Sequence, residues 1–212
     1  MLGIIALFAA LIGGWASITV ENLPDHFVVG KPTNITFSIR QHGHNLLPNL
    51  SPVIDATNGK TQITARAVET NKAGFYTATV TPTQTGDWSL TIQSGFGRSN
   101  QKLVPIRATS SAATPAVAMS DVEYGRRLVV AKGCLACHTH NGVKEFGGET
   151  VGPNLTNTQL PREYLAKFLA DPEGVKKNWS KEGLRMPDLG LTSNEIAALV
   201  TYVSTRNTAL SQ

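Results

Sequence analysis

The sequence predicts three successive parts: an apolar N-terminal anchor helix, an all-β sandwich and an all-α domain. Residues 1–17 contain no charged side chain, and residues 18–107 contain short stretches in which apolar and polar residues alternate. Residues 119–212 carry apolar side chains at helical spacing instead. Between the last two parts, residues 108–118 lack charge and are rich in Ala, Ser, Thr and Pro, which is a composition typical of a linker.

The first segment, MLGIIALFAALIGGWAS, allows two interpretations. As a signal peptide it has an apolar core and a cleavage site of the form Gly14-x-Ala16, but it lacks a basic start. As a membrane anchor it lies at the short end of the about 17–25 residues that span a bilayer, with Trp15 near the interface. We favour the anchor. Either interpretation exports the rest of the chain, so both domains are expected on the outer, periplasmic side of a bacterial cytoplasmic membrane.

The second part is predicted to be an antiparallel sandwich. Its clearest strand is TNITFSIRQ, in which Ile35, Phe37 and Ile39 fall on one face. Short stretches of this kind, separated by turns, bring the number of strands to about seven: HFVVG, TNITFSIRQ, SPVIDA, TQITARAV, GFYTATVTP, DWSLTIQ and QKLVPIRA. Short alternating strands at this spacing are typical of a β-sandwich.

Three helices are predicted in the third part. The first has Ser120 as its N-cap, with a glutamate three residues later, and ends near Gly133. The second starts at Pro161, a residue favoured at the first helical position. The third starts at Thr192 or the next residue. It places apolar side chains on one face: Ile196, Leu199, Val200 and Val203.

The stretch GCLACHTH contains the only two cysteines of the chain, Cys134 and Cys137, and continues with His138. A structural zinc site usually takes its ligands from two separated pairs, yet neither histidine nor cysteine follows His140. A redox dithiol does not need an adjacent histidine. Cys-x-x-Cys-His is, by contrast, the pattern of covalent haem attachment, in which both thiols bind the haem and the histidine is the proximal iron ligand. We therefore predict one covalently bound haem c at this motif.

The second axial ligand is predicted to be Met186. His140 follows His138 too closely in the chain to reach the opposite face of a haem. The other methionines are Met1 and Met119, whereas Met186 lies in GLRMPDLGLT, a loop with glycine and proline as breakers. A single methionine more often fills a gap in a core, but ligation by one histidine and one methionine is an established cytochrome arrangement.

With these motifs, the region from about residue 119 to 209 resembles a monohaem class I cytochrome c domain. The similarity lies in the helix leading into GCLACH, in GPNLTN, in RMPDLGLT and in the terminal helix EIAALVTYV. The resemblance implies that Cys134 and Cys137 are the thioether sites. It also implies that His138 is the proximal ligand and Met186 the distal one.

Two further contacts are implied by the same resemblance. Pro153 would position the ring of His138 through its backbone carbonyl, which makes it part of the cofactor-binding set. Gly125 on the first helix would pack against the last helix near Tyr202. The run HNGVKEFGGETV departs from the family pattern, and its path is not predicted.

The stretch GFYTATVTPTQTGDWSLTI is similar to the small immunoglobulin-like domains of the YtkA or FixH type on bacterial envelope proteins. The sandwich lacks the Cys…Trp…Cys pattern of true immunoglobulin domains. His42 and His44 could bind copper, because neutral imidazoles are good ligands for it. Since the sandwich has no cysteine or methionine to complete such a site, we favour an exposed hairpin loop.

The charge of the chain excludes one class of partner. The formal net charge is +4, from 19 Lys and Arg against 15 Asp and Glu, which is too small to indicate nucleic-acid binding. A local basic run lies just before Met186: Lys176, Lys177, Lys181 and Arg185. We expect this run either to steer an acidic redox partner or to be an ordinary solvated surface, with equal weight.

Together these features predict a membrane-tethered cytochrome c that carries single electrons and is not an enzyme by itself. Its expected partners are redox proteins and other subunits of a respiratory or photosynthetic membrane complex. A haem-based sensor or catalyst is an alternative, but it would need a labile sixth ligand, and the presence of Met186 disfavours it. In a further alternative, the sandwich is a copper-handling assembly factor that receives electrons from the haem domain.

Overall fold

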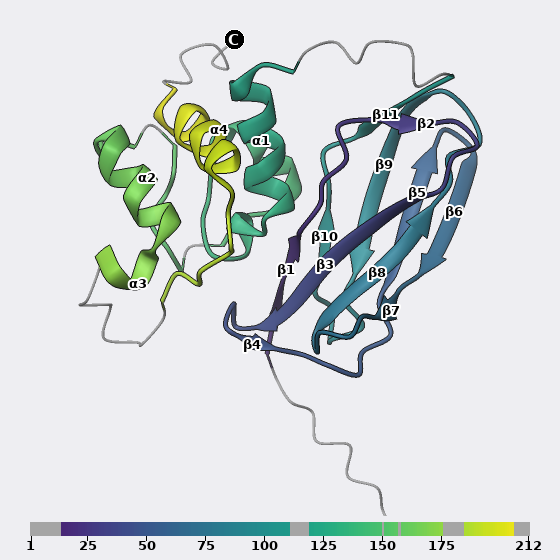
Figure 1. Ribbon diagram of the computed structural model, residues 1–212, viewed down its shortest axis with the longest axis horizontal. Helices are drawn as coiled ribbons and strands as arrows, with labels where there is room; N and C mark the ends of the chain where they lie inside the picture. The colour runs from purple at the N-terminus through teal and green to yellow at the C-terminus, as the bar shows by residue number, and fades with distance from the viewer. Residues whose placement is uncertain (1–13, 111–118, 150, 157, 176–184, 206–212) are drawn as a thin grey trace, which may run out of the picture.

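The computed structural model describes residues 14–110, 119–149, 151–156, 158–175 and 185–205. It consists of a β-sandwich and a helical domain that lie side by side (Figure 1). The helices, including two 3₁₀ helices marked η, are α1 (Asp121–Ala131), η1 (Cys134–Ala136), η2 (Asn141–Phe146), α2 (Arg162–Ala170), α3 (Pro172–Val175) and α4 (Ser193–Ser204).

The sandwich is built from two sheets. Its strands are β1 (Ala16–Val20), β2 (Phe27–Val28), β3 (Thr33–Gln41), β4 (Asn45–Leu46), β5 (Val53–Asn58), β6 (Thr61–Arg66), β7 (Val68–Glu69), β8 (Phe75–Val80), β9 (Gly86–Gln93), β10 (Asn100–Lys102) and β11 (Ile106–Thr109). One sheet has the order β1-β3-β8-β7, with β4 paired to β3. The other has the order β2-β11-β9-β5-β6, with β10 paired to β9. Within the described strands, only β2 and β11 pair in parallel.

Alternating burial gives the sandwich its core. The strand predicted over TNITFSIRQ is confirmed at its full length as β3, and its three alternate apolar side chains are fully buried. β9 contributes an equivalent row from the second sheet. Both rows belong to one apolar core: Ile35, Phe37, Ile39, Trp88, Leu90 and Ile92. Burial on alternate positions fixes the register, because a slip by one residue would expose the whole row.

The predicted fold class is wrong in its N-terminal anchor helix. Ala16 and Ser17, placed at the end of that helix, belong to β1, which pairs antiparallel with β3 and has all five residues buried. Residues 1–13 lie outside the described residues. Across the stretches that the structure describes, no helix combines the length and the apolar character needed to cross a membrane. Ala16, Ile18 and Val20 alternate with Ser17 and Thr19 as in a strand, but the uncharged apolar segment directly before them favoured a helix.

The helical domain confirms the predicted helix starts at both ends. Ser120 caps α1, since its side chain accepts a hydrogen bond from the backbone N–H of Glu123 at 3.2 Å. Thr192 caps α4 in a reciprocal capping box with Glu195. α2 begins one residue after Pro161, which occupies the cap position. The side chains of Ser120 and Thr192 satisfy backbone N–H groups that have no partner inside their helices.

α1 and α4 cross at Gly125, as the family resemblance implied. A Cβ atom at this position would lie 2.2 Å from the carbonyl oxygen of Ala198 and 2.6 Å from the Cβ of Tyr202. Because no side-chain carbon tolerates such contacts, the two helix backbones can approach this closely only where α1 carries glycine.

The boundary between the two domains is a packed interface, with α1 facing β1 and β10 (Figure 1). Arg127 of α1 is only 4% exposed and donates hydrogen bonds to the backbone carbonyls of Asp25 and Pro24, at 3.1 and 3.0 Å. Gln101 of β10 donates to the carbonyl of Ala131 at 3.0 Å. A buried guanidinium requires such partners, so the two domains hold each other in a fixed arrangement.

A second buried cation, Lys132, joins three elements at the same boundary. Its Nζ lies 2.7 Å from a carboxylate oxygen of Glu195 on α4 and donates to the carbonyl of Glu21 at 3.3 Å. Its own backbone carbonyl accepts from the hydroxyl of Thr19 on β1 at 3.4 Å. Lys132 therefore ties the end of α1 both to the start of α4 and to the sandwich.

Candidate functional site

The cysteine motif begins with a turn that only a glycine fits. Gly133 follows α1 in the left-handed region, with φ of 74°, and directs the chain into η1. A Cβ at Gly133 would lie 2.4 Å from the carbonyl oxygen of Ile18, so the sandwich backbone touches the chain here. In a 3₁₀ turn, residues three apart lie on the same side, which places Cys134 and Cys137 together.

Both cysteines are half-buried free thiols that are held in their protonated form. Burial raises the pKa of the Cys134 thiol to about 12. Burial also raises the pKa of Cys137, and the negative charge of Glu149 adds to the effect. Reactive redox cysteines have the opposite property, because their thiol pKa is depressed to favour the thiolate. The environment therefore suits an uncharged sulfur, such as a thiol or a thioether.

His138 is fixed in one tautomer by the segment that follows η2. Its Nδ1 lies 2.7 Å from the carbonyl oxygen of Pro153, which can only accept, so Nδ1–H donates and Nε2 keeps its lone pair. Burial lowers the pKa of His138, although the Pro153 carbonyl opposes this effect. Gly152 has no room for a side chain, because a Cβ would lie 2.4 Å from Cε1 of the imidazole ring. A neutral imidazole with a free lone pair on Nε2 can act as a metal ligand.

Met186 lies in the loop between residue 185 and α4. Two residues after Met186, the side chain of Asp188 accepts a hydrogen bond from the backbone N–H of Gly190 at 2.8 Å, which forms a tight local turn. Gly190 takes a positive φ of 62° there. This turn leads directly into the Thr192 cap, so the loop has a defined shape on the C-terminal side of the methionine.

These predicted residues share one cavity, here called the motif pocket. Its walls include the five predicted cofactor-binding residues: Cys134, Cys137, His138, Pro153 and Met186. They come from η1, from the segment after η2 and from the loop before α4. The structure thus brings together residues that the sequence separates widely. Their roles as thioether sites and axial ligands stay predictions.

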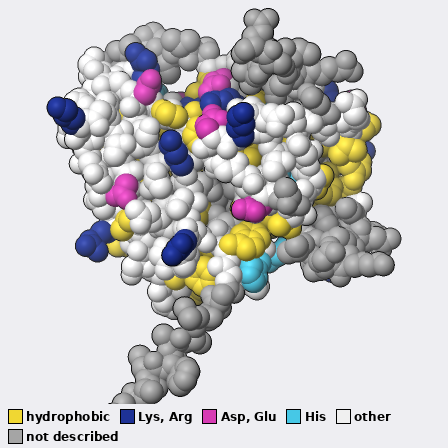
Figure 2. Space-filling model, turned by 180° about the vertical axis from the view of Figure 1, so that it is seen from behind, with side chains coloured by type: hydrophobic (Ala, Val, Ile, Leu, Met, Phe, Trp, Pro, Cys, Tyr) yellow, Lys and Arg dark blue, Asp and Glu magenta, His cyan; other side chains and the backbone are white. Residues whose placement is uncertain are grey.

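The sandwich also contributes to the motif pocket, and the sequence did not predict this contribution. Ser17 and Thr19 of β1, and His42 and Gly43 of the turn between β3 and β4, line the same cavity. Figure 2 shows histidine and hydrophobic side chains together where the two domains meet. The sequence marks the His-Gly-His stretch as a candidate copper site, but no local signal connects it to the cysteine motif, which lies far along the chain.

The two histidines of that turn are exposed residues, in line with the predicted hairpin loop. Among the described residues, no group of three or more His, Cys, Asp or Glu side chains is placed to hold a metal ion. The basic residues Lys176, Lys177 and Lys181 lie outside the described part of the chain. Arg185 is described and exposed, and it lies 3.7 Å from Glu173 in an ion pair.

His140 has a structural role away from the motif pocket. Its ring is 1% exposed and stacks on Tyr202, with ring centroids 4.6 Å apart. Its Nδ1 lies 3.2 Å from the Tyr202 hydroxyl and accepts from the N–H of Gly142. Burial lowers the pKa of His140 and raises that of Tyr202 to about 12, so both side chains are neutral near pH 7.

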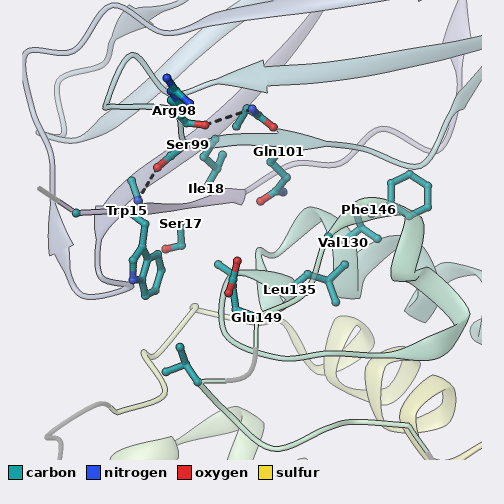
Figure 3. Close-up of a pocket in the computed structure, with 17 residues that line it drawn as sticks. Trp15, Ser17, Ile18, Arg98, Ser99, Gln101, Val130, Leu135, Phe146 and Glu149 are labelled. Atoms are coloured by element: carbon teal, nitrogen blue, oxygen red, sulfur yellow. Dashed lines mark hydrogen bonds between the residues drawn. The ribbon is translucent and has the colours of Figure 1, made fainter.

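A separate hollow, the interface cavity, is lined by residues of both the sandwich and the helical domain (Figure 3). Trp15, Arg98 and Gln101 of the sandwich line it, opposite Leu135 and Glu149 of the helical domain. Its volume is about 460 Å³. It contains none of the predicted cofactor-binding residues, so the motif pocket is the candidate site.

Comparison with known proteins identifies the helical part. Residues 122–207 match the model of the cytochrome c family, which makes the helical domain a cytochrome c domain. The family implies covalently bound haem c. No curated protein matches the chain.

Solved structures resemble the chain only weakly. Domains 4 and 5 of the S-layer protein SbsC are 21% identical, with a TM-score of 0.32 over 44% of this chain and 51% of that one. The Lin-41 filamin domain is 15% identical, with a TM-score of 0.35 over 45% and 93%. The ZirS C-terminal domain is 11% identical, with a TM-score of 0.36 over 51% and 79%. The chain spans about half of the SbsC fragment, and similarities this low carry no conclusion about function.

Proposed function

We propose that this chain, whose residues 122–207 form a cytochrome c domain, is a single-electron carrier that holds one haem c in the motif pocket. The observation that carries the proposal is the meeting of three segments on one cavity. One brings two protonated thiols, one holds His138 with a free Nε2, and one brings Met186.

The residues present fit haem c by their chemistry. Cys134 and Cys137 are free and share one side of a 3₁₀ turn, and a thioether at either sulfur would carry no charge into its buried setting. Glycine at position 152 leaves room for the His138 ring, since a Cβ atom there would collide with the ring. When bound, haem c supplies an iron that takes up and gives back one electron between its ferric and ferrous states.

The chain's own groups would set the properties of that iron. The Pro153 carbonyl holds the His138 tautomer and so keeps Nε2 available as the proximal ligand. Met186 would supply a neutral sulfur as the distal ligand, and methionine ligation raises the reduction potential. With His138 and Met186 both bound to the iron, no position on it would be left for a substrate. This supports a carrier over a sensor or a catalyst.

The experiment that tests the proposal is a visible spectrum of the purified protein in both redox states, with carbon monoxide added to the reduced form. We expect a low-spin c-type spectrum of one haem per chain, a methionine-to-ferric charge-transfer band that Met186→Ala abolishes, and no response to carbon monoxide. A high-spin spectrum with ready carbon monoxide binding would contradict the proposal and favour the sensor or catalyst.

For the partner, the proposal is an acidic redox protein of a respiratory or photosynthetic chain, met on the outer side of the cytoplasmic membrane, where bacteria attach c-type haem. The exposed Arg185 beside Met186 supports it, because a cation near the haem would attract negative charge. The transfer rate should then fall as ionic strength rises. A rate that does not change with salt would contradict electrostatic steering.

For the sandwich, the proposed relationship is to the immunoglobulin-like domains of the YtkA or FixH type. Two antiparallel-dominated sheets around an apolar core, in a domain without cysteine, support that assignment. Binding of copper would be measured by titrating the haem-loaded full chain and His42→Ala with Cu²⁺. Stoichiometric binding lost in the variant would favour a copper-handling domain over a purely structural one.

A further inference from the structure

We propose that the sandwich is a working part of the haem site: its histidine hairpin, residues 42–44, holds the Met186 loop in place, with His44 as the positioning residue. This inference rests on the proposed function, because it concerns the distal ligand of the haem. It is carried by a hydrogen bond from the loop to the hairpin, which lies outside the cytochrome c domain, and by the place of the hairpin in the motif-pocket wall.

The contact is a hydrogen bond across the domain boundary. The backbone N–H of Arg185, the residue before Met186, donates to Nε2 of His44 at 3.4 Å. In addition, the negative charge of Asp188, on the far side of Met186, acts through space on the guanidinium of Arg40 in β3. Burial lowers the pKa of Arg40, and the negative charges of Glu21 and Asp188 oppose that effect. The loop is therefore hydrogen-bonded to the sandwich directly before the methionine, and a charge attraction favours the same placement after it.

The hairpin is rigid enough to serve as a support. Its backbone turns through the left-handed region, with φ of 51° at His42 and 80° at Gly43. The N–H of His44 donates to the carbonyl of Gln41, and the N–H of His42 donates to the carbonyl of Trp15, both at 3.0 Å. The His42 ring packs edge-on against Trp15, with centroids 5.7 Å apart. These bonds fix the backbone of the hairpin from which the His44 side chain extends.

The hairpin cannot easily move away from the loop, because the sandwich is fixed to the helical domain. Arg127 and Lys132, both almost fully buried, bind sandwich carbonyls at the boundary. Opening the interface would remove the sandwich carbonyls that bind these two cations, which is costly in a buried setting. Ser17 and Thr19 of β1 complete the sandwich's share of the motif-pocket wall.

The test measures how readily an external ligand replaces Met186. The ferric, haem-loaded full chain is titrated with imidazole, and displacement is followed by loss of the methionine-to-ferric charge-transfer band. His44→Ala removes the acceptor, so we expect imidazole to bind about two- to tenfold more tightly, as for the loss of one hydrogen bond. His44→Gln keeps an acceptor oxygen and should restore the parent affinity. Asn45→Ala, an exposed neighbour in β4, is the matched control and should not differ from the parent.

The outcomes separate this inference from the proposed function. If the parent chain shows the methionine band but His44→Ala binds imidazole like Asn45→Ala, the positioning role of His44 is overturned and the carrier stands. If His44→Gln weakens the site as much as His44→Ala, the ring acts by filling space, and the hydrogen-bond role is overturned. If the parent chain shows no methionine-to-ferric band, or if Met186→Ala keeps that band, Met186 is not the ligand, and both proposals fail.

Discussion

The sandwich and the cytochrome c domain bury their side chains in different ways. Trp88, Tyr76, Phe27 and Phe37 are all fully buried within the sandwich. In the cytochrome c domain most aromatic side chains stay partly exposed, as at Tyr124, Phe146, Tyr164 and Phe168. The sandwich thus completes a core from its own residues, whereas the helical domain surrounds a pocket. We infer that the sandwich depends on apolar packing for its stability, and that the helical domain depends on the proposed haem and on the sandwich beside it.

The largest expected effect follows from leaving the pocket without its cofactor. In Cys134→Ser/Cys137→Ser, which lacks both proposed attachment sites, we expect amide protection to be lost in α2 and the Met186 loop and weakened in α4, because binding energy at such a site is also folding energy. Protection in β3 and β9 should stay as in the parent. Hydrogen exchange of the full chain measures both. Equal loss in β3 would show that the two domains unfold as one unit.

The next largest effect is expected from a cavity created in the core of the sandwich. Trp88→Ala should lower the free energy of unfolding by about 3–5 kcal/mol, because it empties a fully buried site and removes a hydrogen bond to Gln84. Denaturant unfolding of the haem-loaded and haem-free chains should give the same loss. Val68→Ala, at a residue 64% exposed, is the control and should change stability by less than about 0.5 kcal/mol. A loss below about 1 kcal/mol at Trp88 would contradict the self-contained core.

A smaller effect is expected where α1 crosses α4. Gly125→Ala inserts a carbon that would lie 2.2 Å from the Ala198 carbonyl, so the helices must separate, at a cost of about 1–3 kcal/mol. Thermal unfolding followed by the helical signal measures it. Val122→Ala, an exposed change on the same helix, should have little effect. If both variants unfolded alike, the close crossing would not matter to stability.

The smallest expected effect is a loss of stability at acid pH. Burial raises the pKa of Glu195, but its hydrogen bonds and ion pair with Lys132 and its bonds to Thr192 outweigh burial and hold the pKa below its ordinary 4.5. A depressed carboxyl pKa stabilises the fold above the unfolded value and loses that contribution as pH falls through the folded value. The parent should therefore lose more stability than Glu195→Gln below about pH 4.5. Denaturant titrations across acid pH measure it, and parallel curves would refute it.

Local patterns allowed much of the fold to be predicted. The alternation of β3 and the caps at Ser120 and Thr192 involve neighbours within a few residues, so they are visible in sequence. The short β4 was missed because its two exposed residues show no pattern. β1 was missed because its apolar residues continue an apolar segment.

The candidate site was predictable only on the cytochrome side. The spacing of the two cysteines and His138 is a local motif, and Met186 was the methionine in a suitable loop. The sandwich wall of the motif pocket depends on tertiary packing, which no spacing encodes. Arg127 and Lys132 show the same limit, since cations on a helix usually face solvent and here are buried at a boundary.

The contact between Gly133 and β1 also bears on the order in which the molecule is assembled. The chain directly before Cys134 lies against the carbonyl of Ile18, and both thiols lie in a cavity that β1 helps to close. A catalyst that joins a cofactor to these thiols needs access to them from outside. The sandwich, which is synthesised first, can fold while the rest of the chain is still emerging. Attachment of haem is therefore expected before α1 docks on β1, and docking then encloses the finished bond.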